Sequence, residues 1–206
     1  MKFELLDFIC CPECKEPISL KDEVYEKNEI REGILRCRDG HEYKIVNFIP
    51  RFVKADAYSS SFSYEWLSFS ETQLDSKIGN NLSERQFQGR IDFPLNQIKG
   101  KLVLDAGCGM GRYVEVIKKY GGTIVGIDLS YAVDAAFKNI GFNENVHIIQ
   151  GDILKPPFKK EFFDFIYSFG VLHHTPDAEA AFKSLTGYLK KGGQFSEQDY
   201  WQNFDS

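Results

Sequence analysis

The chain has 206 residues, with 25 lysine or arginine against 30 aspartate or glutamate residues and a formal net charge of −5. Apolar residues make up 43% and charged residues 27%, which is typical of globular proteins and excludes a disordered or fibrous chain. The acidic balance disfavours nucleic-acid partners, because binding to a phosphate backbone draws on clustered basic residues. No run approaches the about 18 apolar residues of a membrane span, and no basic-then-apolar leader is present, so we expect a soluble, cytoplasmic protein.

Composition divides the chain into three predicted parts. Residues 1–54 contain four of the five cysteines and end in an extended-looking run from Ile45 to Pro50. Residues 55–99 are rich in serine, phenylalanine and polar residues and predict a helical linker or cap. Residues 100–206 alternate short β-rich runs with helical patterns. Such alternation predicts an α/β fold with a doubly wound, mostly parallel sheet, preceded here by a small β module.

The first part carries a pattern of metal ligands. Cys11 and Cys14 form a C-x2-C knuckle, and Cys37 and His41 supply C-x3-H after a 22-residue spacer. Two such turns can complete a tetrahedron of three sulfurs and one imidazole around zinc. The alternatives are a disulfide, which a cytoplasmic chain disfavours, or a group of reduced structural thiols. Cys10 is the spare thiol, with an alternating role left open.

This module resembles two known kinds of protein. One is the zinc module at the N-terminus of large-ribosomal-RNA guanine methyltransferases, which combine C-P-x-C with a C-x3-H ending. The other is a family of zinc-ribbon proteins that activate methyltransferases as partner subunits; the runs 3–7 and 43–50 follow its pattern, with departures at proline and glycine positions. A module this small buries little core, so the metal should supply much of its folding free energy in a structural role.

The middle part shows a helical stripe. Three aromatic residues recur at i, i+4 and i+7: Phe62, Trp66 and Phe69. Ser83 and Gln86 predict a capping box at the start of a second helix. Aromatic stripes are usually core, and we expect helices packed on the α/β part near the mouth of its site. A sharper hypothesis is a lid that contributes Tyr64, Trp66 or Arg85 to substrate binding.

The third part predicts a succession of strands and helices. Its four expected strands are Lys101–Asp105, Thr123–Asp128, Val146–Gln150 and Phe162–Ser168. A helix should follow the first strand and stop at Gly121, and a second should run from Ala132 to Gly141. For the third helix, Thr175 is the predicted N-cap, and Lys190 to Gly193 should form its last turn and its end.

Acidic residues end three of these strands. Asp105 precedes a glycine run at positions 107, 109 and 111, Asp128 closes the second strand, and Asp152 follows the third. Each acid alone is more often a solvated or capping residue, and the glycine run alone suits a tight turn. Together they border the crevice where doubly wound sheets bind ligands. The dinucleotide fingerprint requires glycine where Arg112 stands, which argues against a pyrophosphate. Asp105 suits a cationic amine, Asp128 the hydroxyls of a ribose, and Asp152 the amine of adenine, so the implied ligand has these three groups and no phosphates.

Four motifs in order, LDAGCGMGRY, VGIDLS, GDILKPPF and DFIYSFGVLHHTPD, resemble those of class I S-adenosylmethionine-dependent methyltransferases over residues 101–193. The resemblance implies S-adenosylmethionine as cofactor: the first motif contacts its methionine part, the second its ribose and adenine, and the third its adenine. The cofactor-binding residues implied in this sequence are Asp105, Gly107, Cys108, Gly109, Asp128, Leu129, Asp152, Ile153 and Ser168.

The acceptor is less defined. Methyl transfer from a sulfonium requires positioning and exclusion of water more than acid–base chemistry, so the catalytic residues stay unknown. His173 and His174 are the candidate bases, with a purely structural role as the alternative. The motifs of adenine N6- and pyrimidine C5-methyltransferases are absent, and the small size of Cys108 suits the glycine loop better than a nucleophile.

Three functions remain open. The first is a methyltransferase with a small-molecule acceptor, the second an RNA guanine methyltransferase that uses its zinc module for substrate, and the third a non-catalytic cofactor-binding partner protein. The resembling family has seven strands, and this chain has room for one poor strand after Gly193, so the C-terminal strands should be missing, truncated or supplied by another chain. An open sheet edge there favours a homodimer.

Overall fold

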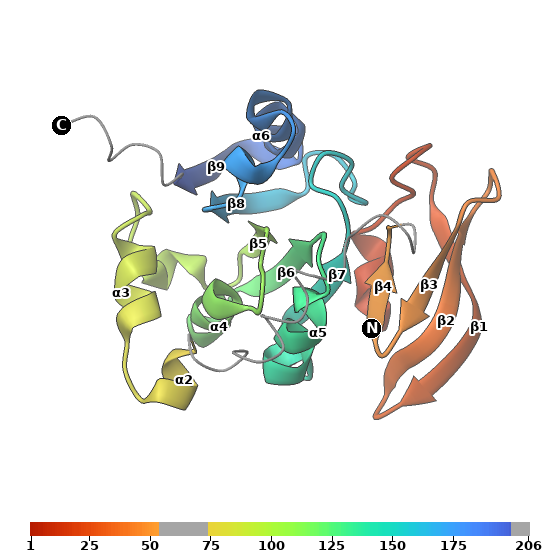
Figure 1. Ribbon diagram of the computed structural model, residues 1–206, viewed down its shortest axis with the longest axis horizontal. Coiled ribbons are helices and arrows are strands. Elements are labelled where there is room, and N and C mark those ends of the chain that lie inside the picture. The colour runs from red at the N-terminus through yellow and green to blue at the C-terminus, as the bar shows by residue number, and fades with distance from the viewer. Residues whose placement is uncertain (54–73, 199–206) are drawn as a thin grey trace.

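The computed structural model describes residues 1–53 and 74–198 of the chain (Figure 1). The strands are β1 (Ile18–Glu26), β2 (Glu29–Cys37), β3 (Glu42–Val46), β4 (Ile49–Arg51), β5 (Leu102–Ala106), β6 (Thr123–Asp128), β7 (Val146–Gln150), β8 (Phe163–Phe169) and β9 (Leu189–Gln198). Within the described residues they form one sheet in the order β1-β2-β3-β4-β7-β6-β5-β8-β9. The predicted α/β class with a preceding antiparallel β module is therefore confirmed.

The second half of the sheet is parallel throughout. Strands β7, β6, β5, β8 and β9 all run in one direction, and the chain enters at β5 in their middle. It winds outward to β6 and β7, then returns to β8 on the other side of β5. The strand order reverses at β5, and the crevice above its carboxyl end is where such sheets take ligands.

The N-terminal strands extend this sheet. β1 to β4 are antiparallel to one another, and β4 then pairs in parallel with β7 through Arg51 and Gln150. The expected continuous run from Ile45 to Pro50 is wrong, because it is split between β3 and β4. Asn47 and Phe48 between them have φ of 50° and 70°, the left-handed conformation of a two-residue hairpin turn.

The helices are short. They are α2 (Asp75–Ile78), α3 (Leu82–Gln88), α4 (Arg112–Lys119), α5 (Ala132–Ala136) and α6 (Ala178–Thr186), with 3-10 turns at Phe3–Asp7, Leu95–Ile98 and Leu172–His174 and a π-helical turn at Phe137–Gly141. None of the helices in the described ranges is long and apolar enough to cross a bilayer.

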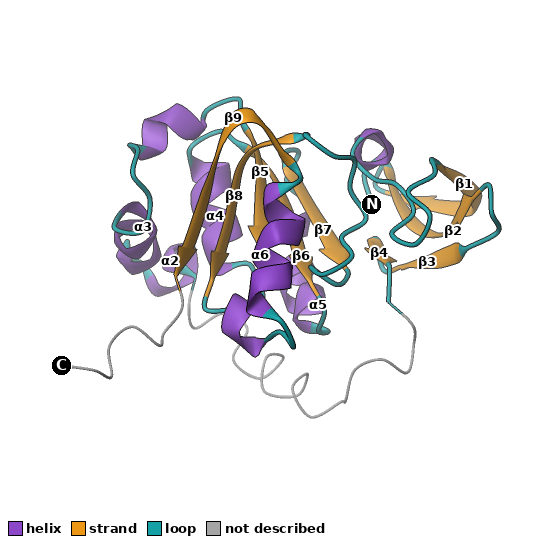
Figure 2. Cartoon of the chain, turned by 90° about the horizontal axis from the view of Figure 1, so that it is seen from above, coloured by secondary structure: helices purple, strands orange, loops and turns teal. Residues whose placement is uncertain are grey.

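Two apolar clusters lie on the two faces of the sheet. Figure 2 shows α6 on one face and α4 on the other. The α4 face joins residues of α3, α4 and α5 to strand residues such as Val103 and Ile124. The α6 face joins Leu104 and Ile166 to α6 and to buried residues of the N-terminal module. The module thus shares a core with the parallel sheet.

The N-terminal segment covers a place on the α6 face that has no helix of its own. Residues 151–162 connect β7 to β8 without a helix, although parallel crossovers usually contain one. Ile9 forms a β-bridge with Phe158, and the amide of Cys10 donates to the Pro157 carbonyl at 2.9 Å. Ile9 and Phe158 are both buried, so the start of the chain fills the position of the absent helix.

The predicted limits of the third helix are wrong at both ends. Asp177, not Thr175, caps α6 by accepting a hydrogen bond from the Ala180 amide at 2.9 Å. The hydroxyl of Thr175 instead donates to the Leu172 carbonyl and closes the preceding 3-10 turn. The segment 190–193 lies in β9, because pairing with β8 from Phe163 onward extends the sheet where the sequence predicted a helix end.

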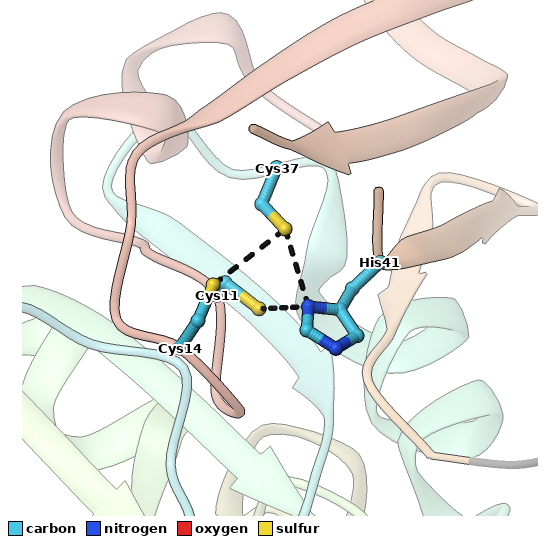
Figure 3. A group of neighbouring side chains, drawn as sticks. All are labelled: Cys11, Cys14, Cys37 and His41. Atoms are coloured by element: carbon cyan, nitrogen blue, oxygen red, sulfur yellow. Dashed lines mark hydrogen bonds between the residues drawn. The ribbon is translucent and has the colours of Figure 1, made fainter. Parts of the chain in front are cut away.

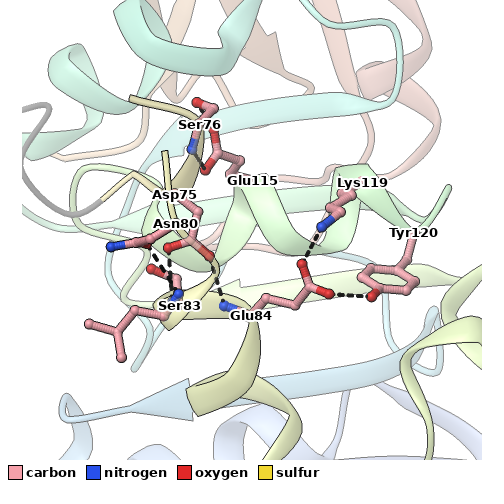
Figure 4. A network of polar contacts seen from close by, with 9 residues as sticks. Asp75, Ser76, Asn80, Ser83, Glu84, Glu115, Lys119 and Tyr120 are labelled. Carbon is pink, nitrogen blue, oxygen red and sulfur yellow. Dashed lines mark hydrogen bonds and ion pairs between the residues drawn. The ribbon is translucent and has the colours of Figure 1, made fainter. Parts of the chain in front are cut away.

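The predicted capping box of α3 is also wrong. Ser83 lies inside the helix, and the amides of Ser83 and Glu84 donate to the carboxylate of Asp75 in α2, at 2.9 and 3.0 Å (Figure 4). Glu84 in turn contacts Lys119 and accepts a hydrogen bond from Tyr120, so α3 is fixed on α4. The aromatic stripe of residues 62, 66 and 69 and the lid candidates Tyr64 and Trp66 lie outside the described residues.

Candidate functional site

The three predicted acids lie at one edge of the sheet. Asp105 is near the end of β5, Asp128 ends β6, and Asp152 follows β7 by two residues. Because β5, β6 and β7 are parallel neighbours, their carboxyl ends meet above the same crevice. The fold therefore brings all three acids to the place where the sequence predicts a ligand.

Asp105 is the most perturbed of these acids. Its side chain is buried, and the Tyr167 hydroxyl donates a hydrogen bond of 2.8 Å to one carboxylate oxygen. Burial above all, with the lowering effect of the Tyr167 hydrogen bond and the raising effect of the nearby Asp128 charge, raises the pKa of Asp105 to about 8. A cationic group placed beside this carboxyl would favour its ionised form. The site is thus suited to a ligand ammonium.

The glycine loop is held against the end of β6. The amides of Gly107 and Cys108 both donate to the Ile127 carbonyl, at 2.8 and 3.0 Å. Gly107 has a φ of 95°, and a Cβ there would lie 2.4 Å from a methyl of Val171, so no other residue fits without movement. Gly111, with a φ of 91°, starts α4. The loop therefore presents its backbone closely to the crevice.

Asp128 ties the glycine loop to the loop after β6. One carboxylate oxygen accepts a hydrogen bond from the Gly109 amide at 2.9 Å. The other accepts from the amide and the hydroxyl of Ser130, at 2.8 and 2.7 Å. Because Asp128 is only partly buried, its carboxylate is both fixed by the protein and open to a ligand.

The other predicted cofactor residues differ in their surroundings. Asp152 accepts a hydrogen bond from the Leu154 amide at 2.8 Å, and Ile153 beside it is buried. Ser168 is fully buried, and its hydroxyl donates to the Ala106 carbonyl at 2.8 Å. Cys108 is buried among apolar atoms, which raises the pKa of its thiol well above the usual value. Such a thiol is a poor nucleophile.

The two histidines follow β8 at the same edge. His173 and His174 belong to the 3-10 turn Leu172–His174, with ring centroids 3.9 Å apart. His174 is exposed and His173 is half-buried. They lie on the loop beside Val171, the residue that packs on the glycine loop. Their position at this edge of the sheet is compatible with an acceptor-facing role.

Sequence reasoning missed Tyr167 and an aromatic cluster beside it. Tyr167 in β8 lies opposite Asp105 in the neighbouring strand β5. This contact could be predicted from the strand register only if the order of the strands in the sheet were known. Around it gather Phe87, Tyr113 and Phe169, with ring centroids 4.9 to 6.4 Å from that of Tyr167. Arg90 bonds to the Tyr113 hydroxyl and lies over the Phe169 ring at 5.2 Å. The four aromatic rings belong to the apolar cluster on the α4 face of the sheet.

A second site lies in the N-terminal module. Cys11, Cys14, Cys37 and His41 have ligand atoms within 4.8 Å of one another, and all four side chains converge in Figure 3. The Cys14 and Cys37 sulfurs are 3.6 Å apart, and Nδ1 of His41 lies 3.6 and 3.3 Å from the Cys11 and Cys37 sulfurs. Ligands around a tetrahedral zinc ion with Zn–S of about 2.3 Å are separated by about 3.8 Å. The cluster is therefore compatible with a zinc module.

Local structure orients this cluster. The Cys11 amide donates to the Glu16 carbonyl, and Gly40, with a φ of 88°, lets the second knuckle turn sharply. The Tyr43 hydroxyl lies 3.2 Å from the Cys11 sulfur and provides an outer contact. The thiol of Cys10 points elsewhere and donates to the Phe158 carbonyl at 3.1 Å. Cys10 is thus engaged with the α/β part in this structure.

The part of the chain that forms the crevice is similar to a known protein family. Residues 104–196, from the end of β5 into β9, match the model of a methyltransferase domain. This part of the chain is similar to methyltransferase domains. The match contains the glycine loop, the second and third acidic motifs and the histidine turn, so it spans every feature of the crevice from Asp105 onward.

Relatives and solved structures agree with this family. The chain is 31% identical to sterol 24-C-methyltransferase of Gibberella zeae over 49% of its own length and 28% of the relative. It is 37% identical to phosphoethanolamine N-methyltransferase 1 of Zea mays over 52% of its length and 22% of the relative. The chain therefore spans less than a third of either of these curated relatives.

Two solved structures share the fold. One, described as an S-adenosyl-L-methionine-dependent methyltransferase of Methanococcus maripaludis, matches with a TM-score of 0.55 and 22% identity over 71% of this chain and 68% of that one. Another belongs to a complex between a Haloferax volcanii methyltransferase activator and a methyltransferase, with a TM-score of 0.56 and 18% identity over 68% and 61% of the two chains. At these identities the likeness concerns the fold.

Proposed function

We propose that the chain is an S-adenosylmethionine-dependent methyltransferase with a small-molecule acceptor. The observation that carries this proposal is the convergence of Asp105, Asp128 and Asp152 on one crevice bordered by a tight glycine loop. Asp105 would receive the ammonium of the methionine part, Asp128 the ribose hydroxyls, and Asp152 with Ile153 the adenine. The remaining predicted contacts come from Gly107, Cys108, Gly109, Leu129 and Ser168.

Small molecules are favoured as acceptors by two facts. The relatives are named for a sterol and for phosphoethanolamine, and the chain carries a net charge of −5, which opposes a nucleic-acid substrate. The protein's part in the reaction would be to align the acceptor with the sulfonium methyl and to exclude water. His173 or His174 would accept a proton from acceptors that carry one on the attacking atom.

Two experiments test the function. Calorimetric titration with S-adenosylmethionine and S-adenosylhomocysteine should give saturable binding, and absence of heat at millimolar ligand would overturn the proposal. Incubation with S-adenosylmethionine labelled in its methyl group should then transfer label to a metabolite extract. Label in RNA would instead support the guanine methyltransferase alternative, and binding without transfer to either would support the non-catalytic partner protein.

We further propose that Cys11, Cys14, Cys37 and His41 hold one structural zinc ion. Three thiolates and one imidazole complete a tetrahedron, which leaves no open position for substrate and favours structure over catalysis. Metal analysis by mass spectrometry should find one zinc per chain. A Cys14→Ser variant that retains a full equivalent of zinc would contradict this ligand set.

A homodimer through the end of the parallel sheet is the proposed assembly. Within the described residues β9 pairs only with β8 and is the edge strand of the sheet, and an edge strand can pair with a second chain. Light scattering coupled to gel filtration should report twice the chain mass of 23.7 kDa. A monomer at all concentrations would remove this part of the proposal.

A further inference from the structure

One side chain of the N-terminal module reaches deep into the α/β part. Arg51, in β4, directs its guanidinium at α5 and at β7. Its two terminal nitrogens bond to the carboxylate of Asp134 at 2.6 and 3.2 Å, and one of them also donates to the side-chain oxygen of Gln150 at 2.9 Å. The side chain of Arg51 is 14% exposed. The contact of Arg51 with Asp134 is therefore partly buried. Its two parallel charge-assisted hydrogen bonds fix the orientation of the guanidinium relative to the carboxylate.

Gln150 continues this contact to the proposed ribose and adenine loop. Its amide nitrogen donates to the Leu129 carbonyl at 3.0 Å, and the residue is 1% exposed. Leu129 lies between Asp128 and Ser130, the residues whose hydrogen bonds shape the ribose site. The side-chain amide of Gln150 thus connects the Arg51 guanidinium directly to the backbone of that loop.

Asp134 connects Arg51 to the other end of the same loop. Asp134 lies in the first turn of α5, and its amide donates to the Tyr131 carbonyl at 3.0 Å. The start of α5 is fixed again by the Ala132 amide, which donates to the Ser130 hydroxyl at 3.2 Å. The Arg51 guanidinium also lies 5.7 Å from the Tyr131 ring centroid. Two residues that bond to the Arg51 guanidinium, Gln150 and Asp134, are therefore themselves bonded to the loop of residues 128–132.

The backbone of the module supports the third motif in the same way. The Phe52 amide donates to the Gln150 carbonyl at 2.8 Å, and the Gly151 amide donates to the Asp128 carbonyl at 2.9 Å. Asp152 follows Gly151 directly in the chain. The end of β4 therefore fixes the exit of β7, from which the proposed adenine-binding residues follow.

We infer that Arg51 is a positioning residue for the adenosine end of the cofactor pocket, through which the N-terminal module pre-orders the loop of residues 128–132. Ordering a loop before the ligand arrives removes that cost from the binding free energy. The inference rests on the proposed function, because the cofactor pocket is itself part of that proposal. Arg51 lies outside the matched methyltransferase domain. It gives the module a specific part in cofactor affinity beyond its contribution to the core.

The test compares two arginine substitutions in the 206-residue chain loaded with zinc. Arg51→Met removes the guanidinium and keeps much of the apolar stem. Arg36→Met is the matched control, because Arg36 is an exposed residue of β2, which β3 separates from β4, and its guanidinium pairs with Glu42 at 3.5 Å. Titration with S-adenosylhomocysteine should show about tenfold weaker binding for Arg51→Met, as expected for about 1.4 kcal/mol, and unchanged binding for Arg36→Met.

A second readout separates positioning from loss of stability. Hydrogen exchange of ligand-free Arg51→Met should be faster in residues 128–132 and unchanged in β2, and saturating S-adenosylhomocysteine should restore protection. If Arg51→Met does not fold, Gln150→Leu provides the same test, because it removes the bond to Leu129 and leaves the pair with Asp134. If the wild type binds S-adenosylhomocysteine and Arg51→Met or Gln150→Leu binds it with an affinity within twofold of the wild type, the inference is overturned and the proposed function is not. A wild type that does not bind overturns the proposed function.

Discussion

Replacement of Asp128 is the most direct perturbation of the proposed cofactor site. Its carboxylate accepts three hydrogen bonds, from the Gly109 amide and from the amide and hydroxyl of Ser130. Asp128→Ala removes the acceptor for Gly109 and the proposed acceptor for the ribose. The two ribose hydroxyls would each donate a charge-assisted bond of about 1.5–3 kcal/mol to Asp128, so their loss costs at least about 3 kcal/mol of binding free energy. We expect binding of S-adenosylhomocysteine to weaken at least about 100-fold.

Asp128→Asn refines this expectation. The amide keeps one acceptor oxygen of the same shape and loses the charge, so the affinity should fall by about tenfold, between the wild type and Asp128→Ala. Asp92→Ala is the control, since Asp92 is an exposed acid outside the matched domain. Isothermal calorimetry gives the affinities, and circular dichroism during heating verifies that each variant is folded. Unchanged affinity in folded Asp128→Ala would refute the assignment of this crevice.

Four further outcomes are expected. Cys14→Ser should lower the zinc content below one per chain by mass spectrometry and lower the melting temperature. Affinity for S-adenosylhomocysteine should increase as the pH rises toward about 8 and then level off. The reason is that burial above all keeps the pKa of Asp105 at about 8, and its ionised form is the one that attracts the ligand ammonium. An affinity that does not change with pH, measured by calorimetry at several pH values, would contradict this expectation. Gly107→Ala should destabilise the fold by about 1–3 kcal/mol in urea unfolding, and adding Val171→Ala should recover part of the loss. Ile9→Ala should cost about 2–5 kcal/mol in a single unfolding transition, whereas two separate transitions would show that the module and the sheet unfold independently.

Local pattern was sufficient for the central parallel strands β6 and β7. The predicted bounds of β6 and β7 coincide with the structure, because both are short apolar runs between glycine or polar turns and both are buried by neighbours on each side. The glycine loop was equally predictable, since the φ values of Gly107, Gly109 and Gly111 are positive and glycine adopts that conformation at low cost.

Tertiary context decided where local pattern failed. Lys190 and Gly192 carry the features of a helix end, yet they belong to β9, because its backbone groups pair with β8. The N-terminus of α3 is capped by Asp75, a residue of a different helix, which a search for a cap inside the helix cannot find. The contact between Tyr167 and Asp105 depends on the order of β5 and β8 in the sheet.

The cysteine ligands were predictable because their spacing is local, whereas the place of their module was not. The bond between Arg51 and Gln150 joins residues 99 positions apart, and the bridge between Ile9 and Phe158 has no sequence signature at either end. The reason for both contacts is found in the connection from β7 to β8, which lacks a covering helix. The N-terminal segment buries the surface that such a helix would cover, and β4 pairs with the strand beside it. A module that completes both the core and the sheet next to the loop of residues 128–132 is structurally part of the proposed cofactor site, although it lies outside the matched domain.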